Sequence, residues 1–200
     1  MRFVSKIFFT ALLSFVVLPG MLSVFTGCSK GYVPKPVGYL RIDSAEGGYR
    51  VFDNAGFPLS FEISEEAVAV VDSMNKGTEW LNILYPRYNA TVYCSYLKLT
   101  PDNMERLFNE SRDLVYVHAG KSDNISAVSY QDTVSGVEAT LYRLSGGAAT
   151  PLQFTVSDGK NYLFRGALYF NSEVNGDSVA PVVDYIEADM ERVIESLRKK

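Results

Sequence analysis

Few side chains in this chain could carry metal or nucleophilic chemistry. Its 200 residues include one histidine, His118, and two cysteines, Cys28 and Cys94. Zinc and iron–sulfur sites draw most of their ligands from these two residue types, so the composition argues against such a centre. The sequence has no Gly-x-Ser-x-Gly elbow, phosphate-binding loop, His-Glu-x-x-His motif or dinucleotide fingerprint. A glycosidase-type pair of carboxylates is neither predicted nor excluded, because such residues pair in space and the sequence marks no particular pair.

Cys28 follows a leader sequence. Arg2 and Lys6 flank the start of an apolar run over residues 7–18, which is typical of a secretory signal. An uncleaved membrane anchor is the alternative, and the Pro-Gly break at 19–20 disfavours it. Residues 25–29, Phe-Thr-Gly-Cys-Ser, resemble a bacterial lipobox, whose thiol accepts a diacylglycerol. We therefore predict lipidation of Cys28 after cleavage before it, with ordinary signal cleavage beside a chance cysteine as the alternative.

If Cys28 is acylated, Cys94 has no partner for a disulfide within the chain. Cys94 shares one face of a predicted strand with Ala90, Val92 and Tyr96. We expect it to be a small buried residue rather than a reactive thiol.

His118 and Arg165 each have two interpretations. His118 lies on the apolar stripe of a predicted helix, so a core or helix-end histidine is favoured over a catalytic base. Arg165 interrupts the apolar run over residues 162–170. It either binds an anion or a partner, or faces solvent or closes a structural ion pair, and the second interpretation is favoured as the commoner outcome. We therefore predict no catalytic, cofactor-binding or metal-binding residue in this chain.

The composition bounds the class of protein. The chain is 47% hydrophobic, 13% aromatic and 21% charged, which argues against disorder. Loss of residues 1–27 leaves 17 basic against 23 acidic residues, a net charge of −6, which argues against nucleic acid as a partner. The expected organisation is a lipoprotein signal peptide over 1–27, a lipid-anchored tether over 28–37 and a single domain over 38–200.

Strand signals dominate that domain. Alternating apolar residues and intervening turn signals predict strands over residues 38–43, 49–53, 59–63, 67–71, 80–85, 88–99, 125–130, 137–144, 152–157 and 161–170. Residues 67–71 are ambiguous with a helix, and their β-branched content favours the strand. Asp158-Gly159 predicts a type I′ turn between the last two strands.

Two amphipathic helices complete the pattern. The first has Thr100 as N-cap, Pro101 at its first position and an end near Gly120, with a stripe of Met104, Leu107, Phe108, Ser111, Val115 and His118. The second spans about residues 179–198, with Asp177 or Ser178 as cap, acids on its outer face and basic residues at its end. Its stripe is Val179, Val183, Ile186, Met190, Val193 and Leu197. Packing on the domain's own sheet is favoured over a coiled coil, because fewer than four heptads are present. The predicted fold class is α+β, a largely antiparallel β-sheet packed with two amphipathic helices.

Several segments, taken in order, resemble the GldD family of gliding-motility lipoproteins from Bacteroidota. They are Pro34 to Ile42, Phe61-Glu62, the Trp80–Pro86 segment running to Ser95-Tyr96, Gln153-Phe154, Arg165 to Asn171, and Asn175 to Ser178. The resemblance covers nearly everything from Cys28 onward. Ile63-Ser64 stands where the family has a proline after Phe-Glu.

The resemblance implies a cell-envelope lipoprotein needed for gliding and for the type IX secretion machinery on which gliding depends. Family members also occur where gliding is absent. A PsbP-like sandwich is one fold that fits the pattern. We expect a protein that is not an enzyme, uses no cofactor or metal, and contacts other envelope, gliding or secretion proteins. An envelope module that binds lipid or glycan on a tyrosine-rich face is the alternative, and an undetected hydrolase is the third.

The residues after Cys28 bear on the membrane side. Ser29-Lys30 lacks both the acidic run that resembles a surface-export signal and the aspartate associated with inner-membrane retention. These absences favour the periplasmic face of the outer membrane.

Overall fold

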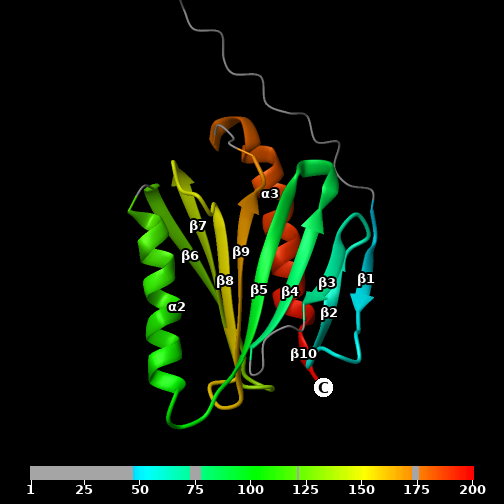
Figure 1. The fold of residues 1–200 in the computed structure, drawn as a ribbon, viewed down its shortest axis with the longest axis vertical. Coiled ribbons are helices and arrows are strands. Elements are labelled where there is room, and N and C mark those ends of the chain that lie inside the picture. Colours follow the sequence, from blue (N-terminus) through cyan, green and yellow to red (C-terminus); the bar gives the residue numbers. More distant parts are fainter. Residues whose placement is uncertain (1–46, 73–77, 121, 173–175) are drawn as a thin grey trace, which may run out of the picture. The chain divides into compact units, whose positions relative to one another are not determined.

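Strands dominate the fold, with two long helices beside them (Figure 1). The computed structural model describes residues 47–72, 78–120, 122–172 and 176–200. The strands are β1 (Tyr49–Phe52), β2 (Leu59–Ser64), β3 (Val68–Asp72), β4 (Thr78–Tyr85), β5 (Ala90–Lys98), β6 (Ser122–Asp132), β7 (Val137–Gly146), β8 (Leu152–Ser157), β9 (Tyr162–Phe170) and β10 (Arg198–Lys199). The helices are α2 (Met104–Ala119), α3 (Gly176–Ser196) and a 3₁₀ turn, η2 (Pro86–Tyr88). The predicted α+β class is confirmed.

In the described part of the chain, the strands form two antiparallel sheets. The large sheet has the order β3-β4-β5-β9-β8-β7-β6, and the small one has the order β1-β2-β10. The register places Trp80 of β4 opposite Ser95 of β5, and Ser95 opposite Arg165 of β9. Because side chains alternate along a strand, these three residues share one face of the large sheet.

One face of the large sheet is covered by the small sheet and by α3. Apolar side chains from β2 pack there against β4, β5, β8 and β9, and the rings of Phe61 and Phe164 have centroids 5.8 Å apart. All six residues of the predicted α3 stripe are buried: Val179, Val183, Ile186, Met190, Val193 and Leu197. The stripe therefore packs on the domain's own sheet, as expected.

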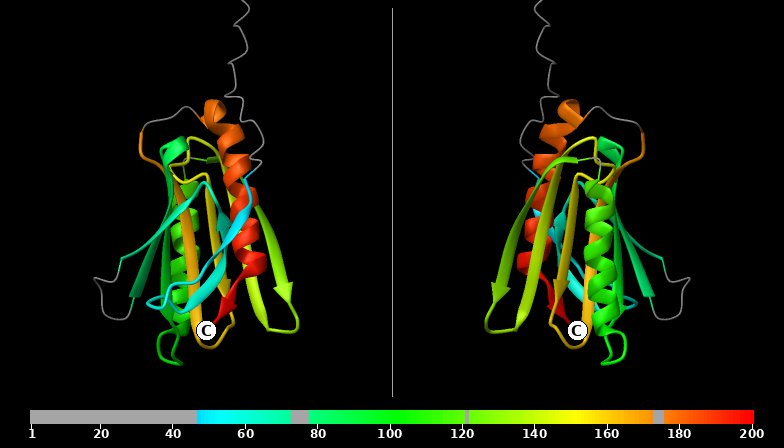
Figure 2. Two further views of the ribbon diagram at one scale, coloured as in Figure 1. Left: turned by 90° about the vertical axis from the view of Figure 1, so that its right-hand side faces the viewer. Right: turned by 90° about the vertical axis from the view of Figure 1, so that its left-hand side faces the viewer.

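The opposite face carries α2, and Figure 2 shows the two helices on opposite sides of the sheet. Leu107 of α2 is buried with Leu97, Leu99 and Leu163 in a second, smaller apolar cluster. The helix contacts β6 and β9 most closely. This placement leaves the β3, β4 and β5 side of the face without a helix among the described residues.

Helix α2 begins later than predicted. It starts at Met104 after Asn103, and Pro101 lies in the turn that precedes it. The Asn103 side chain accepts a hydrogen bond from the backbone N–H of Thr100 at 2.8 Å and donates one to the carbonyl of Lys98 at 3.1 Å. These bonds hold residues 100–103 as a turn, so Thr100 is not the N-cap. The end at Gly120 is confirmed.

The turn between β8 and β9 is not the predicted type I′ turn. Type I′ needs positive φ at both central residues, and here Gly159 has φ of 68° whereas Asp158 does not have a positive φ. The Asp158 carboxylate instead accepts hydrogen bonds from the backbone N–H groups of Lys160, Asn161 and Tyr162. This bonding stabilises a four-residue loop, because the side chain replaces the missing backbone partners.

The C-terminus also differs from expectation. Helix α3 ends at Ser196, and Arg198 and Lys199 pair with Ser60 and Leu59 of β2. Arg198 still donates to the carbonyls of Glu195 and Leu197, so part of the expected charge–dipole contact is present. The helix begins at Gly176, ahead of Asp177 and Ser178, so neither is its N-cap.

The predicted leader, the tether and the strand over 38–43 lie outside the described residues. Neither helix of the described ranges combines the length and apolar content required to span a membrane.

Candidate functional site

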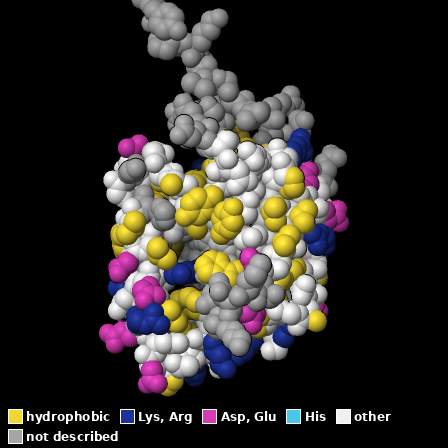
Figure 3. Space-filling view, in the orientation of Figure 1, with side chains coloured by type: hydrophobic (Ala, Val, Ile, Leu, Met, Phe, Trp, Pro, Cys, Tyr) yellow, Lys and Arg dark blue, Asp and Glu magenta, His cyan; other side chains and the backbone are white. Residues whose placement is uncertain are grey.

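The large sheet leaves aromatic and aliphatic side chains exposed beside α2. Val68 and Val70 of β3, Trp80 of β4 and Tyr93 of β5 are 48%, 47%, 38% and 43% exposed, and all point to the α2 side. Tyr169 of β9 joins them, with its ring centroid 5.7 Å from that of Tyr93. We call these five residues the open face. Figure 3 shows hydrophobic side chains gathered over this part of the sheet.

The local sequence explains why this face is apolar. Strands with one solvated face alternate apolar and polar residues, whereas β3 reads Val-Ala-Val-Val and β4 contains Trp-Leu-Asn-Ile-Leu-Tyr. Leu81, Ile83 and Tyr85 fill the core on the α3 side. The alternate residues Trp80, Asn82 and Leu84 point to the α2 side. Except for Asn82, both faces of this part of the sheet are therefore rich in apolar side chains, as in strands that are covered on both faces.

A cavity of about 230 Å³ lies between the open face and α2. It is lined by side chains from the sheet and the helix, among them Trp80, Tyr93, Ser95, Leu114, Arg165 and Tyr169. We call it the Arg165 pocket. Ser111 of α2 also lines it, and the Ser111 hydroxyl is buried without a hydrogen-bond partner among the described residues.

Arg165 lies in this pocket in a half-buried position. Its Nε donates a hydrogen bond to Oγ of Ser95 at 3.0 Å, whereas its buried Nη1 has no partner in the described ranges. Burial lowers the pKa of the guanidinium, and Glu110 acts in the opposite direction. Arg165 is therefore only partly exposed, and no ion pair joins it to a described residue. The structure differs from the favoured interpretation in that α2 and the neighbouring strands surround much of the side chain.

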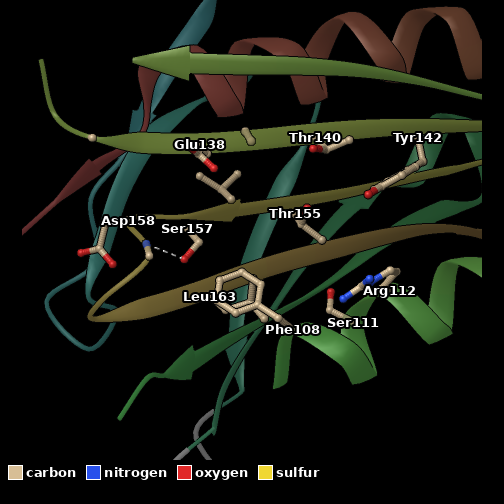
Figure 4. A pocket seen from close by; sticks show the side chains of 14 residues that line it. Phe108, Ser111, Arg112, Glu138, Thr140, Tyr142, Thr155, Ser157, Asp158 and Leu163 are labelled. Carbon is tan, nitrogen blue, oxygen red and sulfur yellow. Dashed lines mark hydrogen bonds between the residues drawn. The ribbon is translucent and has the colours of Figure 1, made fainter. Parts of the chain in front are cut away.

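A second cavity, of about 370 Å³, shares Ser111 and Thr155 with the first and extends under α2 toward the β8–β9 turn (Figure 4). Two acids, Glu138 and Asp158, line it, and a pair of acids is what a two-carboxylate hydrolase uses. Asp158, however, lies at the turn, where four hydrogen bonds occupy its carboxylate. Hydrogen bonds from Asn161 and the backbone lower the pKa of Asp158 although its burial acts in the opposite direction. An acid held ionised in this way is a poor proton donor.

The acids of α3 were expected on the outer face of the helix, and Asp189 is an exception. It is 2% exposed, and Oδ1 accepts a hydrogen bond from the hydroxyl of Tyr49 at 3.1 Å. Burial raises the pKa of Asp189 to about 6, with Glu66 adding to the effect, whereas hydrogen bonds from Tyr49 and Tyr85 lower it. Asp189 lines neither cavity described above, so it lies in the core rather than at a substrate site.

The other residues singled out by the sequence are placed as follows. Cys94 is fully buried, and burial raises the pKa of its thiol, which agrees with the expected role as a small core residue. Cys28 and the side chain of His118 lie outside the described part of the structure. Within that part, no group of three or more His, Cys, Asp and Glu residues is arranged to hold a metal ion.

The sequence model of the gliding motility lipoprotein GldD family matches residues 29–198. The chain belongs to this family. The expected resemblance is thereby confirmed, and membership makes this a membrane-anchored lipoprotein of the cell envelope with a role in gliding motility. The matched region contains the open face and both cavities.

No curated protein matches this GldD-family chain. Among solved structures it is similar to the solution structure of cyanobacterial PsbP (CyanoP) from Synechocystis sp. PCC 6803, at 10% identity and a TM-score of 0.46. That alignment covers 84% of this chain and 99% of the other.

Sequence reasoning missed the open face of this GldD-family domain. The signal was present in the largely apolar composition of β3 and β4, which is typical of strands covered on both faces. The environment of Arg165 was not accessible in that way. It depends on which strands lie beside β9 and on where α2 crosses the sheet.

Proposed function

We propose that this lipoprotein supports gliding motility, and the type IX secretion on which gliding depends, by binding another envelope protein through the open face. The observation that carries the proposal is the exposure of Val68, Val70, Trp80 and Tyr93 on one side of a sheet whose other side is packed. Contiguous apolar surface rimmed by polar groups marks interaction sites in folded proteins, and Trp and Tyr are enriched among the residues that dominate binding energy.

We further propose that the protein is not an enzyme. Asp158 has its carboxylate engaged in loop hydrogen bonds, and Asp189 is enclosed in the core. Glu138 is thus left without a second acid available for proton transfer in its cavity, and its Oε1 accepts a hydrogen bond from Gln131 at 3.2 Å. Two-carboxylate chemistry needs an acid and a base at once, so the described residues favour binding over catalysis.

The proposed location is the periplasmic face of the outer membrane, on the basis of the residues that follow Cys28. A lipid- or glycan-binding module is the second candidate, because exposed Trp80 and Tyr93 rings could stack on sugars or enter an acyl layer. The protein partner is favoured because the open face adjoins a pocket with a charged group, which a sugar-stacking platform does not require.

Photo-crosslinking in intact cells tests the proposal. The full-length lipoprotein would carry p-benzoylphenylalanine in place of Tyr93, with the same substitution at Tyr116 as control, since Tyr116 is 62% exposed on α2 and lines neither cavity. We expect a discrete protein adduct from position 93 and none from position 116. Adducts to lipid or glycan alone, or equal adducts from both positions, contradict the proposal.

A gene deletion tests the process. We expect the deletion strain to lose spreading and the secretion of type IX cargo, and normal spreading and secretion would contradict the proposed role.

A further inference from the structure

We infer that the Arg165 pocket is the anchor point of the partner interface and binds an acidic side chain, Asp or Glu, that is flanked by an apolar residue on the partner protein. This inference rests on the proposed function, because it specifies the chemistry of the partner that the open face would bind. It is carried by the unpartnered guanidinium and by the apolar side chains around it.

The guanidinium is held in a fixed orientation. Ser95 lies directly across from Arg165 on the neighbouring strand, and its hydroxyl accepts the Nε hydrogen at 3.0 Å. One edge of the planar group is therefore occupied. Nη1 lies on the rest of the guanidinium and has no hydrogen-bond partner among the described residues. A guanidinium presents its donors in a rigid fork that matches the two oxygens of a carboxylate.

The nearby acid does not neutralise this charge at close range. Glu110 of α2 is the acid that influences Arg165 electrostatically, yet its carboxylate forms an ion pair with Arg106 at 2.6 Å. A buried charged donor without a partner is unfavourable in the free protein. Binding of a carboxylate removes that unfavourable state, so the pocket favours a ligand that brings a negative charge.

The surroundings of the charge specify what accompanies it. Trp80 and Tyr93 line the pocket on the sheet side, and Leu114, which is 41% exposed, lines it on the helix side. These side chains can contact an apolar group next to the carboxylate. Aromatic residues and arginine together are the commonest strong contributors at protein interfaces.

The size of the pocket favours a side chain over a free small molecule. Its volume of about 230 Å³ lies below the range of about 300 to 1,000 Å³ that is typical of small-molecule sites. The open face extends the contact surface from the pocket toward β3. A protein can use both features at once, by placing an acidic side chain in the pocket and apolar side chains over Val68 and Val70.

The test combines the Arg165→Met substitution with the crosslinker at position 93 of the full-length lipoprotein. Methionine keeps a long unbranched side chain and removes the buried charge. We expect the yield of the protein adduct to fall about tenfold or more, since a hydrogen bond to a charged group contributes on that scale. We expect the melting temperature to stay the same or rise, because an unpaired buried charge is removed.

Arg165→Lys and Arg87→Gln complete the design. Lysine keeps the positive charge but lacks the planar pair of donors that binds both oxygens of a carboxylate, so Arg165→Lys should give an intermediate adduct yield. Arg87 is exposed, pairs with Glu66 and does not line the pocket, so Arg87→Gln should leave the yield unchanged.

Each outcome separates the two claims. An unchanged adduct yield in Arg165→Met contradicts the inference and leaves the proposed function intact, whereas absence of any protein adduct in the parent contradicts both. A parallel loss of melting temperature and adduct shows that Arg165 is structural and overturns the inference. Sequencing of the adduct must find an acidic residue beside an apolar one. The inference would also be overturned if the group in the pocket were a chain-terminal carboxylate or a lipid phosphate.

Discussion

Gly166 of β9 lies directly against the ring of Phe154 on β8. A Cβ at Gly166 would lie 2.4 Å from Cε1 of Phe154 and 3.1 Å from Sγ of Cys94. The two residues face each other across the β8–β9 ladder, and the Phe154 ring covers the space that a side chain would need. The strand that positions Arg165 therefore depends on the absence of a side chain at the next residue.

We predict that Gly166→Ala destabilises the domain. The added methyl group overlaps a ring that is 1% exposed, and overpacking of this kind costs about 1 to 3 kcal/mol. Gly120→Ala is the matched control, because the nearest atom to its Cβ would be 3.7 Å away and its φ is −60°. Urea denaturation should show a lower midpoint for Gly166→Ala alone, and equal midpoints would contradict the packing described.

The buried carboxylate of Asp189 should make stability depend on pH. Its pKa is about 6 in the folded protein and about 3.9 when unfolded, so the folded state binds the proton more tightly between these values. The contribution of Asp189 to the free energy of unfolding is therefore fully present below about pH 4, and it is lost as the pH rises toward 6.

Asp189→Asn removes this titration. We expect the variant to be more stable than the parent at pH 7.5, by an amount on the order of 2 kcal/mol, and to lose that advantage at pH 4. Asp113→Asn on the exposed side of α2 is the control and should keep the pH profile of the parent. A parent protein whose unfolding free energy does not fall between pH 4 and 6 would contradict the assignment.

Much of the fold could be predicted from the sequence because it depends on local alternation. The α3 stripe and the strands from Leu59 to Phe170 were located by their periodicity, with errors of a few residues at the ends. Two of the errors occurred where side chains bond to the backbone. Asn103 shifts the start of α2, and Asp158 converts the predicted two-residue turn into a longer loop.

The site could be predicted less well because it depends on how distant elements meet. Arg165 was identified as unusual, but its surroundings come from Ser95, 70 residues earlier, and from α2. Asp189 lies on a helix among other acids. Its burial follows from contact with Tyr49, 140 residues away.

The two cysteines should differ in reactivity. Cys94 is enclosed in the core and burial raises the pKa of its thiol, so a maleimide reagent at pH 7.5 should label it only after unfolding. If Cys28 is acylated, the native mature lipoprotein should take up no maleimide label. The same protein in denaturant should take up one equivalent, at Cys94. Cys94→Ala should then take up none in either condition. Labelling of the native protein would contradict the burial of Cys94 or the lipidation of Cys28, and peptide mapping would show which.

The open face is the central claim, and complementation of the deletion strain tests it most directly. The strain would express the full-length Trp80→Ser/Tyr93→Ser variant or the control variant Tyr116→Ser/Val117→Ser, whose residues are exposed on α2. Spreading, secretion of type IX cargo, lipoprotein level and melting temperature would be measured together. We predict that the open-face variant is present and folded at parental levels but restores neither spreading nor secretion, while the control restores both. Full restoration by the open-face variant would contradict the account.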